Sequence, residues 1–303
     1  MKTLFYALPA LAVVLSSCVA PLPPEPAIEP PFVPPPTQIQ PAQPEPAWTS
    51  PPAPQIENIS LQTGWRRVGE SRITPLAAAG AWLHEFSVAH DNGAGAEAQF
   101  IVFDTRQCAL RVLDQPDSWA GAGAVDDVID ASGAIAGVNG GFFSPEFAPL
   151  GLMIAGGRRT GSWQANKLLT GTIAVTRGTP RLQWNSESGR GSGCEDFLQC
   201  GPRLVDAGRP MPTLDRAKMA SRTFIAASGG PLWVLGTLHS SSLADLASIL
   251  ATQDLIPGLR IHRALNLDGG RSTALHARLA DGSSRTQSGW STVRNYVAIT
   301  PRR

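Results

Sequence analysis

The sequence lacks the short motifs that identify several large classes of enzyme. It has no His-Glu-x-x-His pattern for catalytic zinc, no Gly-x-Ser-x-Gly elbow of an α/β-hydrolase and no Gly-x-x-x-x-Gly-Lys-Ser/Thr phosphate loop. Its five histidines have no spacing typical of metal ligands. An excess of charge of one sign is also missing, because the formal net charge is +1. We therefore expect neither those enzyme classes nor a nucleic-acid partner.

The first 18 residues have the pattern of an export signal. Lys2 supplies a positive charge, and residues 4–15 form an apolar stretch that is short for a membrane span. The stretch ends in Leu-Ser-Ser-Cys at Cys18, which resembles the lipobox of bacterial lipoproteins. We expect cleavage before Cys18, lipidation of that cysteine, and an exported protein that faces the periplasm or the cell exterior. An ordinary secretory signal with a chance cysteine is the alternative.

Residues 19–58 are rich in proline. Fifteen of the 27 prolines of the chain lie between Ala20 and Pro54. Such a segment forms no core and favours extended polyproline II, which at about 3 Å per residue would reach on the order of 100 Å. We interpret it as a spacer between a lipid anchor and a globular domain. A proline-rich ligand for a partner domain is the alternative.

The chain has four cysteines. Cys194 and Cys200 are close in the sequence, so an oxidising compartment predicts a disulfide between them. A zinc site there is the weaker alternative, because no second Cys/His pair lies nearby in the sequence. Cys108 lies in a strand-like run, and we expect it to be a buried free thiol.

Residues 59–303 have the composition of a globular domain, and no second proline-rich break divides them. Short apolar runs predict nine strands, at 82–88, 98–103, 108–113, 151–154, 172–176, 222–226, 232–235, 261–267 and 295–300. Two helices are predicted at 125–131 and 243–255, and Ser242 with Asp245 resembles a capping box before the second. We predict a single α+β domain (mixed α/β) with an extensive mixed β-sheet and a few covering helices.

Two double-glycine turns follow strand-like runs. Asn139 precedes Gly140-Gly141, and Asp268 precedes Gly269-Gly270. Glycine permits positive φ and the close approach of a ligand, and a carboxylate can do acid–base or metal chemistry. We expect one site between these two strand ends. An Asx turn at Asp268 with a purely structural role is the alternative.

Three further segments complete a pattern: Gly201–Val205, Ser221-Arg222-Thr223 and Val293–Tyr296. Their order, together with the two double-glycine turns, resembles the phosphodiester glycosidase family from about residue 102 to the C-terminus. That family includes an enzyme that removes N-acetylglucosamine from a sugar phosphodiester, and many exported bacterial proteins related to exopolysaccharide. The resemblance implies a glycan or sugar-phosphate substrate.

The resemblance also implies three catalytic residues. Asp268 would act as base or nucleophile, Arg222 would bind the phosphate, and Asn139 would bind the sugar or position water. Arg222 as a structural salt-bridge partner is the alternative. Substrate contacts are expected at Gly140, Gly141, Thr223, Gly269, Gly270, Arg271, Ser272 and Arg294, with Glu146 added as a reserve carboxylate from its position after the first turn. Arg271 departs from the family pattern, which has a small residue there, and this leaves the substrate open.

We therefore expect an exported, membrane-tethered hydrolase of glycosyl phosphodiesters in envelope or exopolysaccharide glycans, with no cofactor. A divalent metal on Asp268 is an alternative, although the spacing fixes no second carboxylate beside it. Two other functions stay open. One is a glycan-binding envelope lipoprotein without turnover, and the other is a structural envelope protein whose proline-rich arm binds a partner. The sequence does not indicate the oligomeric state.

Overall fold

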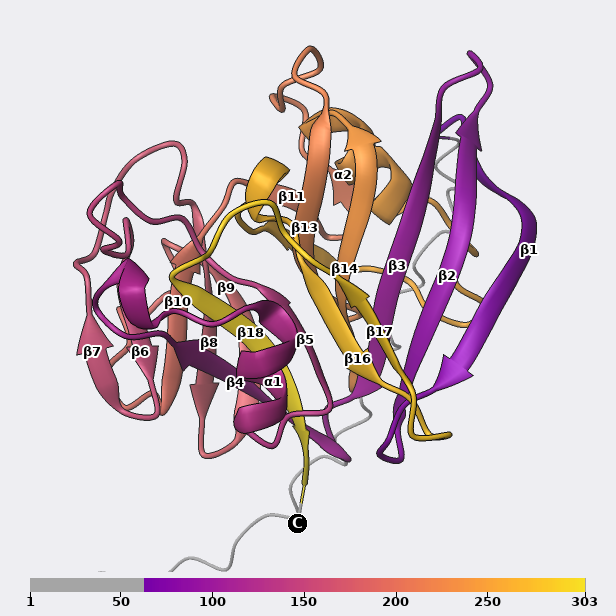
Figure 1. Cartoon of the computed structure of the whole chain (residues 1–303). Helices are drawn as coiled ribbons and strands as arrows, with labels where there is room; N and C mark the ends of the chain where they lie inside the picture. The colour runs from indigo at the N-terminus through magenta and orange to yellow at the C-terminus, as the bar shows by residue number, and fades with distance from the viewer. Residues whose placement is uncertain (1–62, 303) are drawn as a thin grey trace, which may run out of the picture. The chain divides into compact units, whose positions relative to one another are not determined.

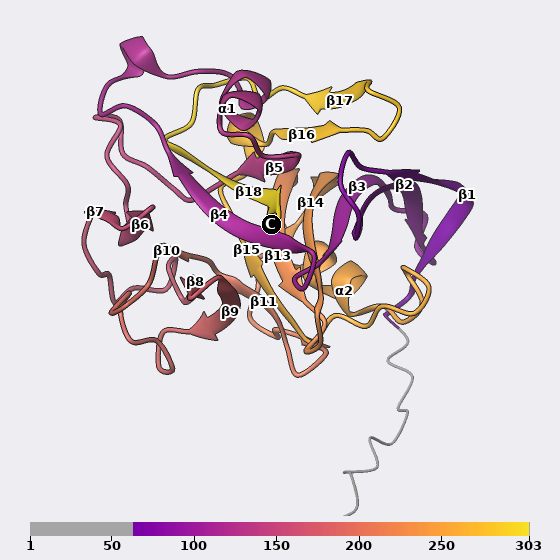
Figure 2. The same ribbon diagram turned by 90° about the horizontal axis from the view of Figure 1, so that it is seen from below.

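Strands dominate the domain. The computed structural model describes residues 63–302, so the predicted signal segment (1–18) and spacer (19–58) lie outside the described residues. The described residues form three sheets of eight, five and five strands. Figures 1 and 2 show these sheets from two directions.

The largest sheet has the strand order β1-β2-β3-β14-β13-β15-β11-β12, and each neighbouring pair in it is antiparallel. Its strands are β1 (Trp65–Pro75), β2 (Ala81–His90), β3 (Gly95–Asp104), β14 (Leu232–Ser241), β13 (Ala220–Ala227), β15 (Arg263–Asn266), β11 (Arg203–Asp206) and β12 (Arg209–Pro210).

Two five-stranded sheets, also antiparallel, complete the domain. One has the order β7 (Arg158–Thr160), β6 (Met153–Ala155), β10 (Asp196–Cys200), β8 (Gly171–Thr176) and β9 (Thr179–Trp184). The other has the order β17 (Ser284–Gln287), β16 (Leu275–Arg278), β5 (Ala136–Asn139), β18 (Asn295–Pro301) and β4 (Cys108–Asp114).

Both faces of the largest sheet are buried over much of their area. On one face, Leu83 and Leu235 belong to a core that also contains Val138 of β5 and Leu198 of β10, so this core joins all three sheets. On the other face, Phe224 packs in a second core that includes residues of helix α2. Side chains alternate between the two faces of a strand, and burial on both sides explains why the strands read as nearly continuous apolar runs.

The part of the chain that the structure describes has two α-helices, α1 (Val125–Ala131) and α2 (Leu243–Ala251). Both predicted helices are thus confirmed, and α2 ends before the predicted Leu255. At its start the Ser242 hydroxyl accepts a hydrogen bond from the Asp245 N–H at 3.1 Å, and the Asp245 carboxylate accepts one from Ser242 N–H at 3.4 Å. This is the predicted capping box. Within residues 63–302, no helix combines the length and apolar character needed to cross a bilayer.

The predicted fold class is wrong. The domain is mostly β, with three antiparallel sheets in place of one extensive mixed sheet with several covering helices. Each of the nine predicted strands overlaps an observed one. The error arose because a helix and then a strand precede each double-glycine turn, an order typical of α/β folds. Strands such as β1, half-buried or exposed along most of its length, give no continuous apolar signal and were missed.

The predicted disulfide is not formed in the structure, where Cys194 and Cys200 are both free thiols. Cys200 ends strand β10, and Cys194 lies just before that strand begins. Five extended residues alone separate the ends of β10 by about 13 Å, whereas bridged cysteines need Cα atoms within about 7 Å. Cys108 is buried and free, as predicted.

Candidate active site

The two double-glycine turns meet at the ends of β5 and β15. The Asp268 N–H donates a hydrogen bond to the carbonyl oxygen of Gly140 at 2.9 Å. Gly140 in turn donates its N–H to the carbonyl oxygen of Asn295 on β18 at 2.8 Å. A Cβ at position 140 would collide with the Asn295 side chain, so only glycine fits there. The two turns are therefore in direct contact, as expected from the sequence.

Asn139 is fully buried and holds the two turns together. Its amide nitrogen donates to the carbonyl oxygen of Asp268 at 2.7 Å. Its amide oxygen accepts hydrogen bonds from the Thr223 hydroxyl at 2.7 Å and from the Ala274 N–H at 3.0 Å. The polar atoms of Asn139 are thus engaged with the protein, which makes it a positioning residue for Asp268.

Of the two predicted carboxylates, Asp268 and Glu146, only Asp268 lies at the junction of the two turns. Burial raises the pKa of the Asp268 carboxyl above its usual range, and hydrogen bonds from the Ser272 hydroxyl and the Gly269 N–H oppose part of that shift. The Gly269 N–H lies 2.9 Å from the carboxylate oxygen. A carboxylate with limited solvation and few donors is a stronger base than an exposed one. Ser272 and Gly269, both predicted to contact substrate, bond to the Asp268 carboxylate.

Arg222 lies behind the Gly269 turn. Arg222 and Thr223 are neighbours on β13 and therefore face opposite sides of the sheet. The Arg222 guanidinium donates to the carbonyl oxygens of Ser241, at 2.9 Å, and Lys218. Burial lowers the pKa of Arg222 and the charge of Asp215 opposes that shift, but an arginine stays protonated. Arg222 is thus a buried cation, with two of its three guanidinium nitrogens bonded to backbone carbonyl oxygens.

Arg294 is committed to partners away from Asp268. Its side chain is 2% exposed, and its nitrogens bond to Asp114 at 2.9 Å, to Asp117 at 2.6 Å and to the carbonyl oxygen of Phe147 at 3.0 Å. The Gly141 N–H is likewise occupied, by the Asn295 side-chain oxygen at 2.7 Å. Asn295 was not predicted, although it stands next to Arg294 in the motif that drew attention to that arginine.

The second turn is open to solvent at Gly270 and Arg271. Gly270 has φ of +64°, and no atom lies within 4 Å of where a Cβ would stand, so a ligand can approach this backbone closely. Arg271 is exposed, and its carbonyl oxygen accepts the N–H of Trp290 at 2.7 Å. Trp290 is 85% exposed. In the sequence Trp290 lies between Gly289 and Ser291, and an aromatic residue in such a polar, glycine-containing segment was the signal that could have identified it.

Glu146 lies in the exposed turn after β5. Hydrogen bonding from Ser144 lowers its pKa, so its environment is the reverse of that of Asp268. Among residues 63–302, no group of three or more His, Cys, Asp or Glu side chains is arranged to hold a metal ion. The described site therefore offers one half-buried carboxylate, a nearby open turn with an exposed arginine, and a buried arginine behind that turn.

A half-buried carboxylate between two glycine turns, on antiparallel sheets, defines a candidate site for acid–base or nucleophilic chemistry. The phosphodiester glycosidase family model matches residues 132–300, a span that includes both turns, and the chain belongs to that family. The predicted family is thus confirmed. No curated protein matches the chain.

Two solved structures share the fold. The catalytic domain of zebrafish N-acetylglucosamine-1-phosphodiester alpha-N-acetylglucosaminidase, auto-inhibited by its pro-peptide, is 14% identical with a TM-score of 0.54 over 77% of this chain and 88% of that one. A hypothetical protein from Synechocystis is 16% identical with a TM-score of 0.53 over 79% of this chain and 68% of that one. At such identities the similarity establishes the fold alone.

Proposed function

We propose that this protein hydrolyses glycosyl phosphodiesters, with Asp268 acting at the anomeric carbon as base or nucleophile. The observation that carries the proposal is the Asp268 carboxylate itself. It is half-buried at the junction of two turns, burial raises the pKa of its carboxyl, and it lies within the residues that match the family model. Carboxylates with perturbed pKa values are typical of glycosidase sites.

The chemistry of the bond explains why one carboxylate is sufficient. A phosphate is an acidic leaving group, so it departs without protonation by an enzyme acid. Water adds to the anomeric carbon, the bond from that carbon to the phosphate oxygen breaks, and a phosphomonoester leaves with the bonding electrons. As base, Asp268 accepts the proton of the water. As nucleophile, it first forms a glycosyl ester that water then hydrolyses.

The phosphate is expected to lie over the Gly270 turn. The open backbone at Gly270 and the exposed guanidinium of Arg271 form a surface on which two phosphate oxygens can be bound. Arg222 stands behind the same turn, because its side chain lies within 4 Å of a Cβ built at Gly269. Its buried charge would add positive potential without touching substrate. The exposed ring of Trp290 is placed to stack on a sugar.

We further propose that the protein is exported and tethered to a membrane through Cys18, with residues 19–58 as a spacer. The support for this is the sequence alone. Substrates in envelope or exopolysaccharide glycans would be consistent with a tethered domain that acts on chains near the membrane.

Hydrolysis of the methyl phosphodiester of N-acetylglucosamine 1-phosphate tests the activity. We expect the wild type to release N-acetylglucosamine, and Asp268→Asn to lose turnover by 10²-fold or more, on the order expected for an essential base or nucleophile. Asp281→Asn is the matched control, because Asp281 lies in an exposed turn where its carboxylate bonds only to Ser283 within the described residues. Equal turnover by wild type and Asp268→Asn would contradict the assignment.

A glycan-binding protein without turnover is the alternative, and one observation favours it. Of the three arginines expected at the phosphate, Arg294 has all three guanidinium nitrogens bonded to carboxylates or a backbone carbonyl, and Arg222 has two of its three bonded to backbone carbonyls. Arg271 is the exposed cation of the three. Saturable binding of N-acetylglucosamine phosphodiesters by wild type, without release of sugar over a broad substrate panel, would establish this alternative.

A further inference from the structure

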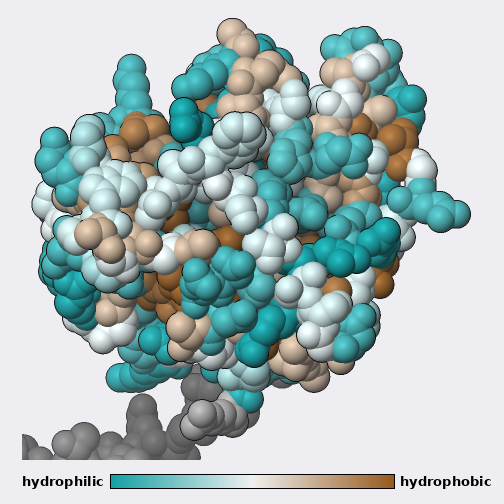
Figure 3. Space-filling model, in the orientation of Figure 1, coloured by the Kyte–Doolittle hydropathy of each residue, from teal (hydrophilic) through white to brown (hydrophobic). Residues whose placement is uncertain are grey.

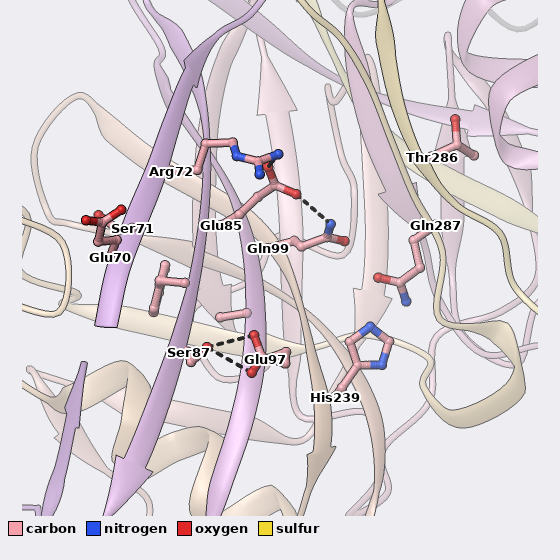
Figure 4. Close-up of a pocket in the computed structure, with 12 residues that line it drawn as sticks. Glu70, Ser71, Arg72, Glu85, Ser87, Glu97, Gln99, His239, Thr286 and Gln287 are labelled. Carbon is pink, nitrogen blue, oxygen red and sulfur yellow. Dashed lines mark hydrogen bonds and ion pairs between the residues drawn. The ribbon is translucent and has the colours of Figure 1, made fainter. Parts of the chain in front are cut away.

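A polar cleft of about 760 Å³ lies on the largest sheet beside β17, and the site described above does not account for it. Figure 4 shows its side chains, which come from β1, β2, β3, β14 and β17. Those that bear on its chemistry are Arg72, Glu85, Glu97, Gln99, His239 and Gln287. Figures 1 and 2 show β17 held in front of β14 and β3, which leaves the sheet uncovered toward β1.

The cleft exists because one face of the sheet changes from apolar to polar along its strands. Four fully buried side chains lie in register across β2, β3, β14 and β13: Leu83, Ile101, Leu235 and Ile225. Two residues away on each strand, and so on the same face, the register row is Glu85, Gln99, Thr237 and Thr223. Hydrophilic residues also gather on this side of the molecule in Figure 3, over the middle of the view.

The cleft adjoins the candidate active site through β17. Gln287 lines the cleft, and its side-chain oxygen accepts a hydrogen bond from Thr237 at 3.0 Å. Thr237 is the register partner of Thr223, which is bonded to Asn139, the residue that holds the Asp268 turn. One row of polar side chains therefore leads from the cleft to the site.

A second connection runs through His239. This side chain lines the cleft and lies 3.2 Å from the Ser221 hydroxyl. The carbonyl oxygen of Ser221 lies 2.9 Å from a Cβ built at Gly269, so the turn after Asp268 packs directly on Ser221. The cleft is thus connected to the site twice, through Thr237 and Thr223 and through His239 and Ser221.

The polar groups of the cleft call for a ligand that donates hydrogen bonds. One carboxylate oxygen of Glu85 and the amide oxygen of Gln99 are buried without a hydrogen-bond partner among the described residues. Arg72 and Arg285 approach that same Glu85 oxygen at 3.6 and 4.0 Å, beyond hydrogen-bond length, so much of the Glu85 charge is already balanced. The carboxylate of Glu97 adds negative charge. Ionised phosphate has only acceptors and would be repelled here, whereas sugar hydroxyls can donate.

We propose that the polar cleft binds a neutral, hydroxyl-rich saccharide chain that extends from the bond cleaved at Asp268. The proposal rests on the proposed function, and it defines the substrate as the phosphodiester of an oligosaccharide or polysaccharide. The four strands from β14 to β1 span about 14 Å at the usual strand spacing, which is room for several sugar units. Hydroxyls of such a chain can donate hydrogen bonds to the acceptor side chains that line the cleft, which favours binding of a saccharide over binding of an anion.

Binding of four unbranched tetrasaccharides, built from glucose in α or β linkage, from N-acetylglucosamine and from mannose, tests the cleft without turnover. We expect calorimetry on the full-length protein to detect at least one of them. Gln99→Leu should weaken that binding roughly tenfold, the effect of one or two lost hydrogen bonds. Gln107→Leu is the matched control, because Gln107 is exposed in the turn after β3. Thermal unfolding checks that both variants fold.

Comparison of two substrates separates the cleft from the proposed function. The diesters carry N-acetylglucosamine 1-phosphate on methanol or on the tetrasaccharide that binds best. We expect kcat/KM to be at least tenfold higher for the longer diester, and Gln99→Leu to remove that preference while leaving methyl diester turnover unchanged. Equal rates for both diesters, or failure of all four tetrasaccharides to bind, would overturn the cleft proposal. Tetrasaccharide binding that depends on Gln99, with neither diester hydrolysed, would support the cleft and overturn the hydrolase.

Discussion

Burial disfavours the ionised form of the Asp268 carboxyl, and this determines the pH dependence of turnover that we expect. The pKa of its carboxyl is raised by burial, with Ser272 and Gly269 opposing part of the shift. As base or nucleophile, Asp268 must be ionised. Turnover should therefore fall with decreasing pH through a group that titrates above the range of an exposed aspartate, and kcat/KM measured against pH on the methyl diester checks this. An acid limb at or below the ordinary aspartate pKa would contradict the role.

The same burial predicts that Asp268→Asn is more stable than the wild type at neutral pH. A raised folded-state pKa means that the folded protein binds the proton more tightly than the unfolded chain does. The stability from protonation is then full below the unfolded pKa and is lost as pH rises through the folded pKa. Asparagine never carries the charge, so we expect a gain of about 0.5–2 kcal/mol at pH 7. Urea unfolding should show the difference vanish below about pH 4, and a less stable variant at pH 7 would refute it.

Asn139 and Thr223 allow a graded test of the network that positions Asp268. Asn139→Ala leaves the Asp268 carbonyl, the Thr223 hydroxyl and the Ala274 N–H without their hydrogen-bond partner. We expect a loss of about 2–5 kcal/mol in the free energy of unfolding. Thr223→Val keeps the shape and removes one donor, so about 1 kcal/mol is expected. Chemical denaturation measures both, and the surviving Thr223→Val enzyme should show lower kcat with KM little changed. An unaffected kcat in Thr223→Val would mean that the network only stabilises the fold.

At the scale of elements, helices and strands could be predicted from the sequence where their buried residues form a one-sided or a continuous apolar pattern. The capped α2 and the short α1 were predicted because their patterns depend on neighbours a few residues apart. The pairing of strands was not predictable, because it joins distant segments: β3 pairs with β14, and β5 with β18. The fold class depends on such pairings, which explains why correct strands were assembled into the wrong class.

The parts of the candidate site that could be predicted are those that depend on short stretches of sequence. The two glycine turns and Asp268 could be identified from spacing, but the direction of each side chain could not. Arg222 and Thr223 were both expected to contact the substrate, yet neighbouring positions on a strand face opposite sides. The polar cleft was missed because its side chains come from five strands, and each is ordinary in its own segment.

Arg294 joins three elements, and we expect its loss to destabilise the fold. It links the start of β18 to Asp114 at the end of β4 and to the loop that contains Phe147. Arg294→Met would leave Asp114 buried with less compensation, with an expected loss of about 3 kcal/mol or more in urea unfolding. Arg158 contacts the same carboxylate from a 51% exposed position, so Arg158→Met should change stability by about 1 kcal/mol or less. A stable Arg294→Met variant that loses turnover would instead place this arginine in the substrate site.

At the scale of the whole domain, the site lies where the three sheets meet. Asp268 follows β15 of the largest sheet, and Asn139 ends β5 of the five-stranded sheet that contains β18. Gly141 packs against Leu198 of β10, which belongs to the other five-stranded sheet. The polar cleft opens from the same junction along the largest sheet. This arrangement holds the carboxylate between paired strands and leaves an open sheet face beside it, as the proposed action on a saccharide chain requires.

The proposed action on glycans near a membrane is consistent with a tethered domain, and Cys18 is the residue on which the proposed tether depends. We expect Cys18→Ser to move the protein from the membrane fraction to the soluble fraction, because a serine cannot carry the thioether-linked lipid. Cys194→Ser is the matched control, since Cys194 is a free and partly exposed thiol within the folded domain. Fractionation of cells that produce each full-length variant, followed by detection of the protein, gives the result. Retention of Cys18→Ser in the membrane fraction would overturn the anchor, and it would leave the activity assigned to Asp268 unaffected.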